Sequence, residues 1–262
     1  MAERLPIIRQ PPQRWLDWWA HWGGSAGAVR AAYPQAQRTA VEPDDALRAK
    51  SLSQLPPWWS RRRWGPQADA VLRAGEVDVA CAEMVWANMM LHACADLAGE
   101  FARWHRALAP DGFVMFSTLG PGTLAELRLL YNERAWGPAF YPFADMHDLG
   151  DLLVHAGFAD PVMDQEQLTL TWSSPQAALQ ELRTLGSNLH AARHVGLRTP
   201  RWRDRLLAHL ERRRDADGRI ALSFEVVYGH AIRPRARARM APVSAVSLQD
   251  LRADLARQRS PH

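Results

Sequence analysis

The pattern of apolar and polar positions is clearest between residues 77 and 128, where two apolar runs flank a helical segment. The first run, VDVACAEMVWAN, ends at Asn88, and the second, FVMFSTLG, follows a proline–aspartate–glycine turn. A run that is apolar on both faces is typical of a parallel strand covered by helices on each side. Ligands of open parallel sheets bind beyond the carboxyl ends of the strands. The rim of the predicted pocket therefore holds Trp86, Asn88, Thr118 and Gly120.

Spacing and capping residues predict three helices in the same half of the chain. From Leu97 to Leu108, apolar residues recur at intervals of four, three and four, which is the stripe of an amphipathic helix. The segment Thr123–Glu126 matches a capping box and predicts the start of a second helix. Asp145 is expected to cap a third helix, which ends at Gly157.

The first third of the chain has the order of a nucleotide-binding strand–helix–strand unit. The pattern predicts a strand over Trp15–Trp19, a turn, a helix over Ala26–Ala32 and a second strand. In such a unit the turn lets the backbone approach the ligand, and an acid after the second strand accepts hydrogen bonds from ribose hydroxyls. The residues in the binding positions are Asp17, Gly23, Gly24 and Glu42. A tryptophan-rich packing segment with an ordinary turn is the alternative interpretation.

The carboxyl-terminal half predicts two strands with helices between them. The segment QLTLTW alternates polar and apolar residues, and RIALSFEVVYGHAI forms a second, longer strand. The residues between these strands predict a helical insertion over 175–215, which we expect to act as a lid. The domain organisation expected is a single domain over 1–232, followed by a basic tail over 233–262 with a short helix that Ser247 caps.

Two segments carry weaker signals. Residues 1–13 are rich in proline and polar side chains, and they predict a loose lead-in. A third strand is expected within residues 50–76, but no pattern locates it. In that segment Trp58 and Trp59 precede three arginines. We expect the tryptophans to be pinned under the domain with the arginines over them, and binding of bases or phosphate is the alternative.

Composition excludes several classes of protein. The net charge is +4 and the basic residues are spread along the chain, which makes nucleic acid an unlikely partner. No apolar run approaches the ~18 residues of a membrane span. Cys81 and Cys94 lie in apolar surroundings and predict buried thiols, so a cytoplasmic location is expected. Ten histidines occur without a metal-binding motif, and no metal is expected.

One long segment, VWANMMLHACADLAGEFARWHRALAPDGFVMFSTLGPGTLAELR, resembles the fourth-strand to fifth-strand region of class I S-adenosyl-L-methionine methyltransferases. More narrowly, it is similar to the malonyl-[acyl-carrier protein] O-methyltransferase family of biotin synthesis. Further matches, including PFADMHDLGDLLVHAGFADPVMDQEQLTLTW and GRIALSFEVVYGHA, follow in that family's order over roughly residues 77–232. The resemblance implies an α/β fold with a doubly wound, mostly parallel, Rossmann-like sheet.

The cofactor loop departs from the family's pattern. That pattern, Leu-Asp-x-Gly-x-Gly-x-Gly, is met here only by Leu16, Asp17 and Gly23, because Trp19 and His21 replace the first two glycines. Glycines in this loop let the main chain approach the methionine part of the cofactor. Either the loop has shifted onto the later glycines, or cofactor affinity is reduced or absent.

The resemblance also implies a reaction. S-adenosyl-L-methionine would be the cofactor, lying against Trp86 and Asn88, and malonyl-acyl-carrier protein or malonyl-CoA would be the substrate. An ionised carboxylate is already a nucleophile, so alignment and desolvation would suffice without a general base. The candidates for steadying the substrate carboxylate are His92, Tyr131, Arg183 and Arg193. Two alternatives remain, namely a scaffold protein without cofactor and a methyltransferase for another acceptor. The sequence predicts no oligomeric state.

Overall fold

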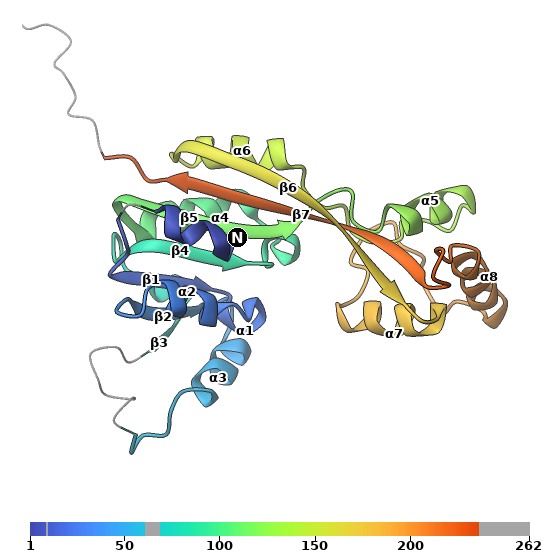
Figure 1. Cartoon of the computed structure of the whole chain (residues 1–262), viewed down its shortest axis with the longest axis horizontal. Coiled ribbons are helices and arrows are strands. Elements are labelled where there is room, and N and C mark those ends of the chain that lie inside the picture. The colour runs from blue at the N-terminus through green and yellow to red at the C-terminus, as the bar shows by residue number, and fades with distance from the viewer. Residues whose placement is uncertain (9, 61–68, 236–262) are drawn as a thin grey trace, which may run out of the picture.

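A seven-stranded sheet in the order β3-β2-β1-β4-β5-β7-β6 forms the centre of the molecule (Figure 1). The computed structural model describes residues 1–8, 10–60 and 69–235. Strands β1 to β5 are parallel, and β7 runs antiparallel between β5 and β6. The bounds of the strands are β1 Arg14–Trp18, β2 Gln37–Glu42, β3 Ala70–Arg73, β4 Ala82–Asn88, β5 Leu108–Leu119, β6 Ala159–Trp172 and β7 Ile220–Ile232. The predicted doubly wound, mostly parallel sheet is confirmed.

Helices cover both faces of the sheet and its far end (Figure 1). The α-helices are α1 Ala20–Gly23, α2 Ala26–Ala32, α3 Asp45–Ser53, α4 Leu97–Ala107, α5 Ala125–Glu133, α6 Met146–His155, α7 Pro175–Thr184 and α8 Pro200–Glu211. The short 3-10 helices are η1 Ala2–Ile7, η3 Ala74–Glu76 and η4 Leu91–Ala93. Among the described helices, none has both the length and the apolar composition needed to cross a membrane.

Two aromatic cores explain why the central strands are apolar on both faces. On one face, α4 packs its predicted stripe onto the sheet, and the Phe101 and Trp104 rings lie 5.1 Å apart, centre to centre. On the other face, Trp15 and Trp86 pack beneath η1 and α2. Each core removes several large side chains from water, at about 25 cal/mol per Å² of apolar surface. Burial on both sides therefore accounts for the continuous apolar runs of these strands.

The ribbon of β6 and β7 extends past the parallel sheet and carries a second lobe (Figure 1). Residues 226–232 of β7 pair with β5, whereas residues 220–225 pair only with β6. Around this extension α5, α7 and α8 form a separate apolar cluster that includes Trp172, Leu206 and Leu222. We refer to residues 175–219, with α7 and α8, as the helical lobe. Its role as a lid stays a proposal.

Side-chain caps begin α4 and α6, and the cap at α6 was predicted from the sequence. The Asp96 carboxyl accepts a 2.9 Å hydrogen bond from the Gly99 amide at the start of α4. The Asp145 carboxyl accepts a 2.8 Å bond from the His147 amide at the start of α6. Just beyond α6, Gly157 has φ +97°, the left-handed conformation that ends many helices. In each case the signal and its partner lie within one helical turn.

The predicted capping box at α5 is wrong. Helix α5 begins after Leu124, which has φ 50° and makes no side-chain cap. The Thr123 hydroxyl instead lies 3.0 Å from the Glu225 carbonyl oxygen, and the Glu126 carboxyl accepts a 2.6 Å bond from the Ser223 hydroxyl. Both side chains are therefore used by β7, about a hundred residues further along the chain.

The predictions for the two segments with weaker signals, residues 1–13 and 50–76, were also corrected. Residues 2–7 form η1 rather than a loose lead-in, because the buried Leu5 packs beside Tyr33, whose hydroxyl donates a 2.8 Å bond to the Leu5 carbonyl. The missing third strand is β3, which has only four residues and so shows no alternation. Trp58 and Trp59 are largely exposed rather than pinned, with ring centres 5.8 Å apart. The three arginines that follow them, and the predicted carboxyl-terminal helix, lie outside the described residues.

Candidate active site

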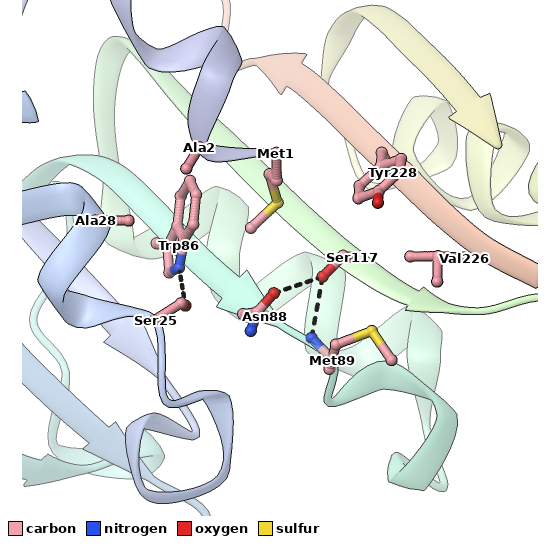
Figure 2. A pocket seen from close by; sticks show the side chains of 10 residues that line it. All are labelled: Met1, Ala2, Ser25, Ala28, Trp86, Asn88, Met89, Ser117, Val226 and Tyr228. Carbon is pink, nitrogen blue, oxygen red and sulfur yellow. Dashed lines mark hydrogen bonds between the residues drawn. The ribbon is translucent and has the colours of Figure 1, made fainter. Parts of the chain in front are cut away.

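A pocket of about 300 Å³ opens at the carboxyl ends of β4 and β5 (Figure 2). This volume is at the small end of the range for ligand sites. It lies where the doubly wound fold is expected to bind a ligand. The pocket is lined by Met1, Ala2, Ser25, Ala28, Trp86, Asn88, Met89, Ser117, Val226 and Tyr228.

Asn88 joins three elements at the floor of this pocket (Figure 2). Its Nδ2 donates a 2.6 Å hydrogen bond to the Gly23 carbonyl, and its Oδ1 accepts a 2.7 Å bond from the Ser117 hydroxyl. The Met89 amide donates to the Ser117 carbonyl at 2.8 Å. The orientation of the Asn88 side-chain amide is therefore assigned, because its nitrogen and its oxygen each have a hydrogen-bond partner. These bonds fix the ends of β4 and β5 against the turn between α1 and α2.

Trp86 lies two residues earlier on β4 and points to the same side of the sheet (Figure 2). Its indole nitrogen donates a 2.7 Å hydrogen bond to the Ser25 hydroxyl, at the start of α2. The ring is buried. Trp86 and Asn88, both predicted to contact the cofactor, thus line the same pocket, and Asn88 bonds to Gly23, a third predicted contact.

The cofactor loop keeps a left-handed backbone at the first replaced glycine. Trp19 has φ 53° and ψ 50°, and its amide donates a 2.7 Å bond to the Val41 carbonyl. That conformation costs a residue with a side chain about 1–2 kcal/mol. The Trp19 ring lies edge-on to Trp22, with centres 5.6 Å apart. Gly24, with φ +59°, closes the same turn at the end of α1. At position 19 the backbone therefore has a conformation suited to glycine, although the residue there is tryptophan.

Glu42 ends β2 beneath this turn and has one unused oxygen. Its Oε1 accepts a 2.9 Å bond from the His21 amide and a 2.5 Å bond from the Ser51 hydroxyl. Its Oε2 is buried and has no partner among the described residues. A buried acceptor without a partner is rare, and a ribose hydroxyl would satisfy it. Glu42 is 0% exposed. A ribose therefore reaches Oε2 only when the α1 turn shifts.

Asp17 makes a buried ion pair instead of facing the pocket. Both Nε and Nη2 of Arg38 donate to Asp17 Oδ2, at 2.8 and 2.6 Å, and Nη1 donates to Asp69 at 2.9 Å. Burial raises the pKa of Asp17, and the positive charge of Arg38 opposes that rise. Asp17 therefore supports the end of β1, and its predicted contact with the cofactor stays a prediction.

None of the four candidates for the substrate carboxylate lines the pocket. His92, in η4, lies edge-on to Phe143, with ring centres 6.3 Å apart. Tyr131 packs between Trp136 and Trp202 in the second lobe, and burial raises the pKa of its hydroxyl. Two arginines, Arg183 and Arg193, are exposed on the helical lobe. Their roles stay predictions.

Several residues that line or support the site had no usable sequence signal. Ser117 belongs to no motif, yet its hydroxyl orients Asn88. Ser51 lies within α3, and nothing in the sequence relates it to Glu42. Tyr228 lines the pocket from the antiparallel strand β7, and no sequence motif includes it. In the part of the chain that the structure describes, no three His, Cys, Asp or Glu side chains are grouped as metal ligands would be.

Curated relatives cover most of the chain. A malonyl-[acyl-carrier protein] O-methyltransferase of Laribacter hongkongensis is 41% identical over 245 residues, spanning 91% of this chain and 82% of the relative. A protein of the same name from Gallionella capsiferriformans is 39% identical over 241 residues, spanning 90% and 82%. A search of family models gave no match.

Solved structures share the fold at low sequence identity. YcgJ of Bacillus subtilis superposes with a TM-score of 0.56 at 13% identity, over 89% of this chain and 97% of its own. Phosphoethanolamine N-methyltransferase 2 of Haemonchus contortus, in complex with S-adenosyl-L-methionine, superposes with a TM-score of 0.51 at 16% identity, over 89% and 51%. At these identities the likeness shows the fold alone.

Proposed function

This chain belongs to the malonyl-[acyl-carrier protein] O-methyltransferase family, and from that membership we propose that it methylates the free carboxylate of malonyl-acyl-carrier protein. The identity to named relatives across about 90% of the chain is the observation that carries the proposal. The enzyme uses S-adenosyl-L-methionine. We also propose that the reaction serves biotin synthesis and takes place in the cytoplasm, where both substrates are made.

The chemistry needs little from the protein beyond alignment. When bound, the cofactor supplies an electrophilic methyl group on its sulfonium. A carboxylic acid with an ordinary pKa near 4 is ionised at pH 7, so the malonyl carboxylate attacks without help from a base. The residues of the pocket hold the two reactants together and exclude water. Exclusion of water makes the carboxylate more nucleophilic, and alignment lowers the entropic cost of reaching the reactive geometry.

We assign the cofactor to the edge formed by β1, β2 and β4. Glu42 Oε2 is the buried acceptor available to ribose hydroxyls, as Ser51 and the His21 amide already occupy Oε1. Asn88 and Trp86 hold the turn at Gly23 and Ser25, which forms the wall nearest the methionine end. The residues present therefore fit S-adenosyl-L-methionine in their hydrogen-bonding chemistry.

The substrate carboxylate needs a partner from outside the pocket wall. Among the ten residues that line the pocket, none has a cationic side chain. A carboxylate that leaves water without a donor loses much of its solvation free energy. We therefore propose that His92 or Tyr131, or the arginines Arg183 and Arg193, meet the carboxylate when the helical lobe closes over the pocket. Arginine suits this role because its two-pronged donor set matches a carboxylate.

The test is transfer of labelled methyl from S-adenosyl-L-methionine to malonyl-acyl-carrier protein. Acetyl-acyl-carrier protein, which lacks the free carboxylate, is the matched control and should remain unlabelled. A calorimetric titration with S-adenosylhomocysteine checks cofactor binding independently, and a bound ligand should raise the melting temperature. Folded protein that gives neither label nor heat would instead support a scaffold without cofactor. Biotin-independent growth of a strain that lacks its own methyltransferase tests the pathway.

A further inference from the structure

The helical lobe is one of two strongly basic segments of the chain. Residues 175–219 contain ten arginines against five acidic residues, a net charge of +5, whereas the whole chain has +4. The other basic segment is residues 233–262, with seven arginines against two acidic residues, and the rest of the chain has an acidic excess. Within the described residues, Arg214 is the one arginine of the lobe that forms an ion pair, with Glu211. The other nine charges are not neutralised by a neighbouring carboxylate of that part.

Large aliphatic side chains project from the same lobe into solvent. In the loop that joins α7 to α8, Leu189 is 78% exposed, Val195 is 87% exposed and Leu197 is 97% exposed. Three exposed arginines follow at once on the first turns of α8, namely Arg201, Arg203 and Arg205. Exposed apolar groups beside charge are a mark of interaction sites. We call these six residues the lobe surface.

The backbone beneath the lobe surface is held in place. Asn188 Nδ2 donates a 2.8 Å bond to the Pro138 carbonyl, and Arg198 Nη2 donates a 2.6 Å bond to the Trp136 carbonyl. The Arg198 guanidinium also lies 4.8 Å from the centre of the Trp202 ring. The loop is therefore anchored on its inner side, and its aliphatic residues face outward from a fixed base.

The lobe surface is connected to the pocket through β7. Val226 lines the pocket, and Leu222, four residues earlier on the same strand, packs with Leu206 and Leu210 of α8. A partner on α8 would therefore sit on the lobe that β7 joins to the pocket, about four strand residues, or roughly 13 Å, from Val226 along β7. Aliphatic side chains favour a protein partner over a nucleic acid, because bases stack on aromatic rings and these residues supply none.

We propose that the lobe surface is the docking site for the acyl-carrier protein, an acidic protein whose helices would face the arginines. This inference rests on the proposed function and adds the surface that recognises the carrier. Charge complementarity would raise the association rate, while the aliphatic residues would supply the apolar centre of a transient interface. The occupant is thus one acidic protein, held on the lobe that β7 joins to the pocket, and its malonyl group would reach the pocket from there.

The test compares two double variants with the native enzyme. Arg201→Glu with Arg205→Glu reverses two charges on one face of α8, and Val195→Ser with Leu197→Ser removes two exposed apolar groups. We expect each to weaken the binding of malonyl-acyl-carrier protein, measured by surface plasmon resonance, by on the order of tenfold. Binding by the native enzyme should fall as salt rises, and the charge-reversed variant should show a shallower dependence.

The controls separate docking from folding and from chemistry. Arg106→Glu and Val79→Ser change exposed residues outside the lobe and should leave carrier binding unchanged. The affinity of both lobe variants for S-adenosylhomocysteine should also match the native value. Unchanged carrier binding in both lobe variants would overturn the inference, as would tighter binding to anionic vesicles or RNA than to the carrier. Carrier binding without methyl transfer would instead count against the proposed function.

Discussion

The hydroxyl of Ser51, on α3, donates a 2.5 Å hydrogen bond to Oε1 of Glu42, at the end of β2. With the His21 amide on the same oxygen, this bond leaves Oε2 as the available acceptor. Ser51 is therefore a positioning residue for the proposed ribose contact. It acts through Glu42 and lines no part of the pocket itself.

Ser51→Ala should weaken binding of S-adenosylhomocysteine by roughly tenfold, since a hydrogen bond to a charged group contributes about 1.5–3 kcal/mol. The change is measured by calorimetry. Ser53→Ala is the matched control, because that hydroxyl lies two residues along the same helix and bonds only to the Lys50 carbonyl. A 2′-deoxy analogue of the ligand should lose less affinity on the Ser51 substitution. Equal losses for both ligands would contradict the positioning role.

Asn88→Asp should impair cofactor binding more than Asn88→Ala does. The Nδ2 group donates to the Gly23 carbonyl, whereas an aspartate oxygen at that place would face the carbonyl oxygen and repel it. We expect an affinity for S-adenosylhomocysteine lower by on the order of a hundredfold for aspartate and tenfold for alanine, by analogy with unpaired buried polar groups. Titration calorimetry measures both. The reverse order would show that the bond to Gly23 has no part in holding the site.

Trp19 should tolerate glycine better than alanine. Both substitutions remove the same indole, so their difference isolates the backbone at φ 53°. Glycine adopts that conformation without steric cost, and we expect Trp19→Gly to be more stable than Trp19→Ala by about 1 kcal/mol in urea unfolding. Trp22, three residues later and inside α1, is the control. There alanine should be the more stable by about 0.5–1 kcal/mol.

Arg38→Met should destabilise the fold by about 3–5 kcal/mol at pH 7, because it leaves Asp17 buried without its cation. Burial already raises the pKa of Asp17, and loss of Arg38 removes the opposing influence. The folded-state pKa of Asp17 in the variant then lies above its unfolded value. Stability should accordingly be greatest at low pH, with Asp17 protonated, and should fall as pH rises through the folded-state pKa.

Urea unfolding of the Arg38 variant from about pH 4 to pH 8 measures that slope. Arg30→Met is the matched control, since Arg30 also pairs with a carboxylate, Asp69, but its own side chain is half exposed. Such a pair contributes less than about 1 kcal/mol, so little change is expected. A pH-independent loss in the Arg38 variant would mean that packing of its side chain, rather than the charge, stabilises this edge of the sheet.

Local features of the fold could be predicted because their causes lie within a few residues. The limits of α2, Ala26–Ala32, were predicted correctly, and Asp145 caps its helix as expected. The central strands were found because burial on both faces leaves a continuous apolar run. The resemblance supplied the fold class and the family, since a long ordered match is far more specific than any single motif.

The sequence by itself determined the central strands, the helices with a clear apolar stripe, the mostly parallel sheet and the family. Tertiary structure alone decided which polar groups meet. Thr123 bonds to Glu225, about a hundred residues away, instead of capping its own helix, and Ser51 reaches Glu42 from a helix that carries no motif. Asp17 finds Arg38 on the adjacent strand, so its carboxyl is committed before any ligand arrives. Periodicity and caps are local and leave a record in sequence, whereas these partners are set only when the strands and helices pack.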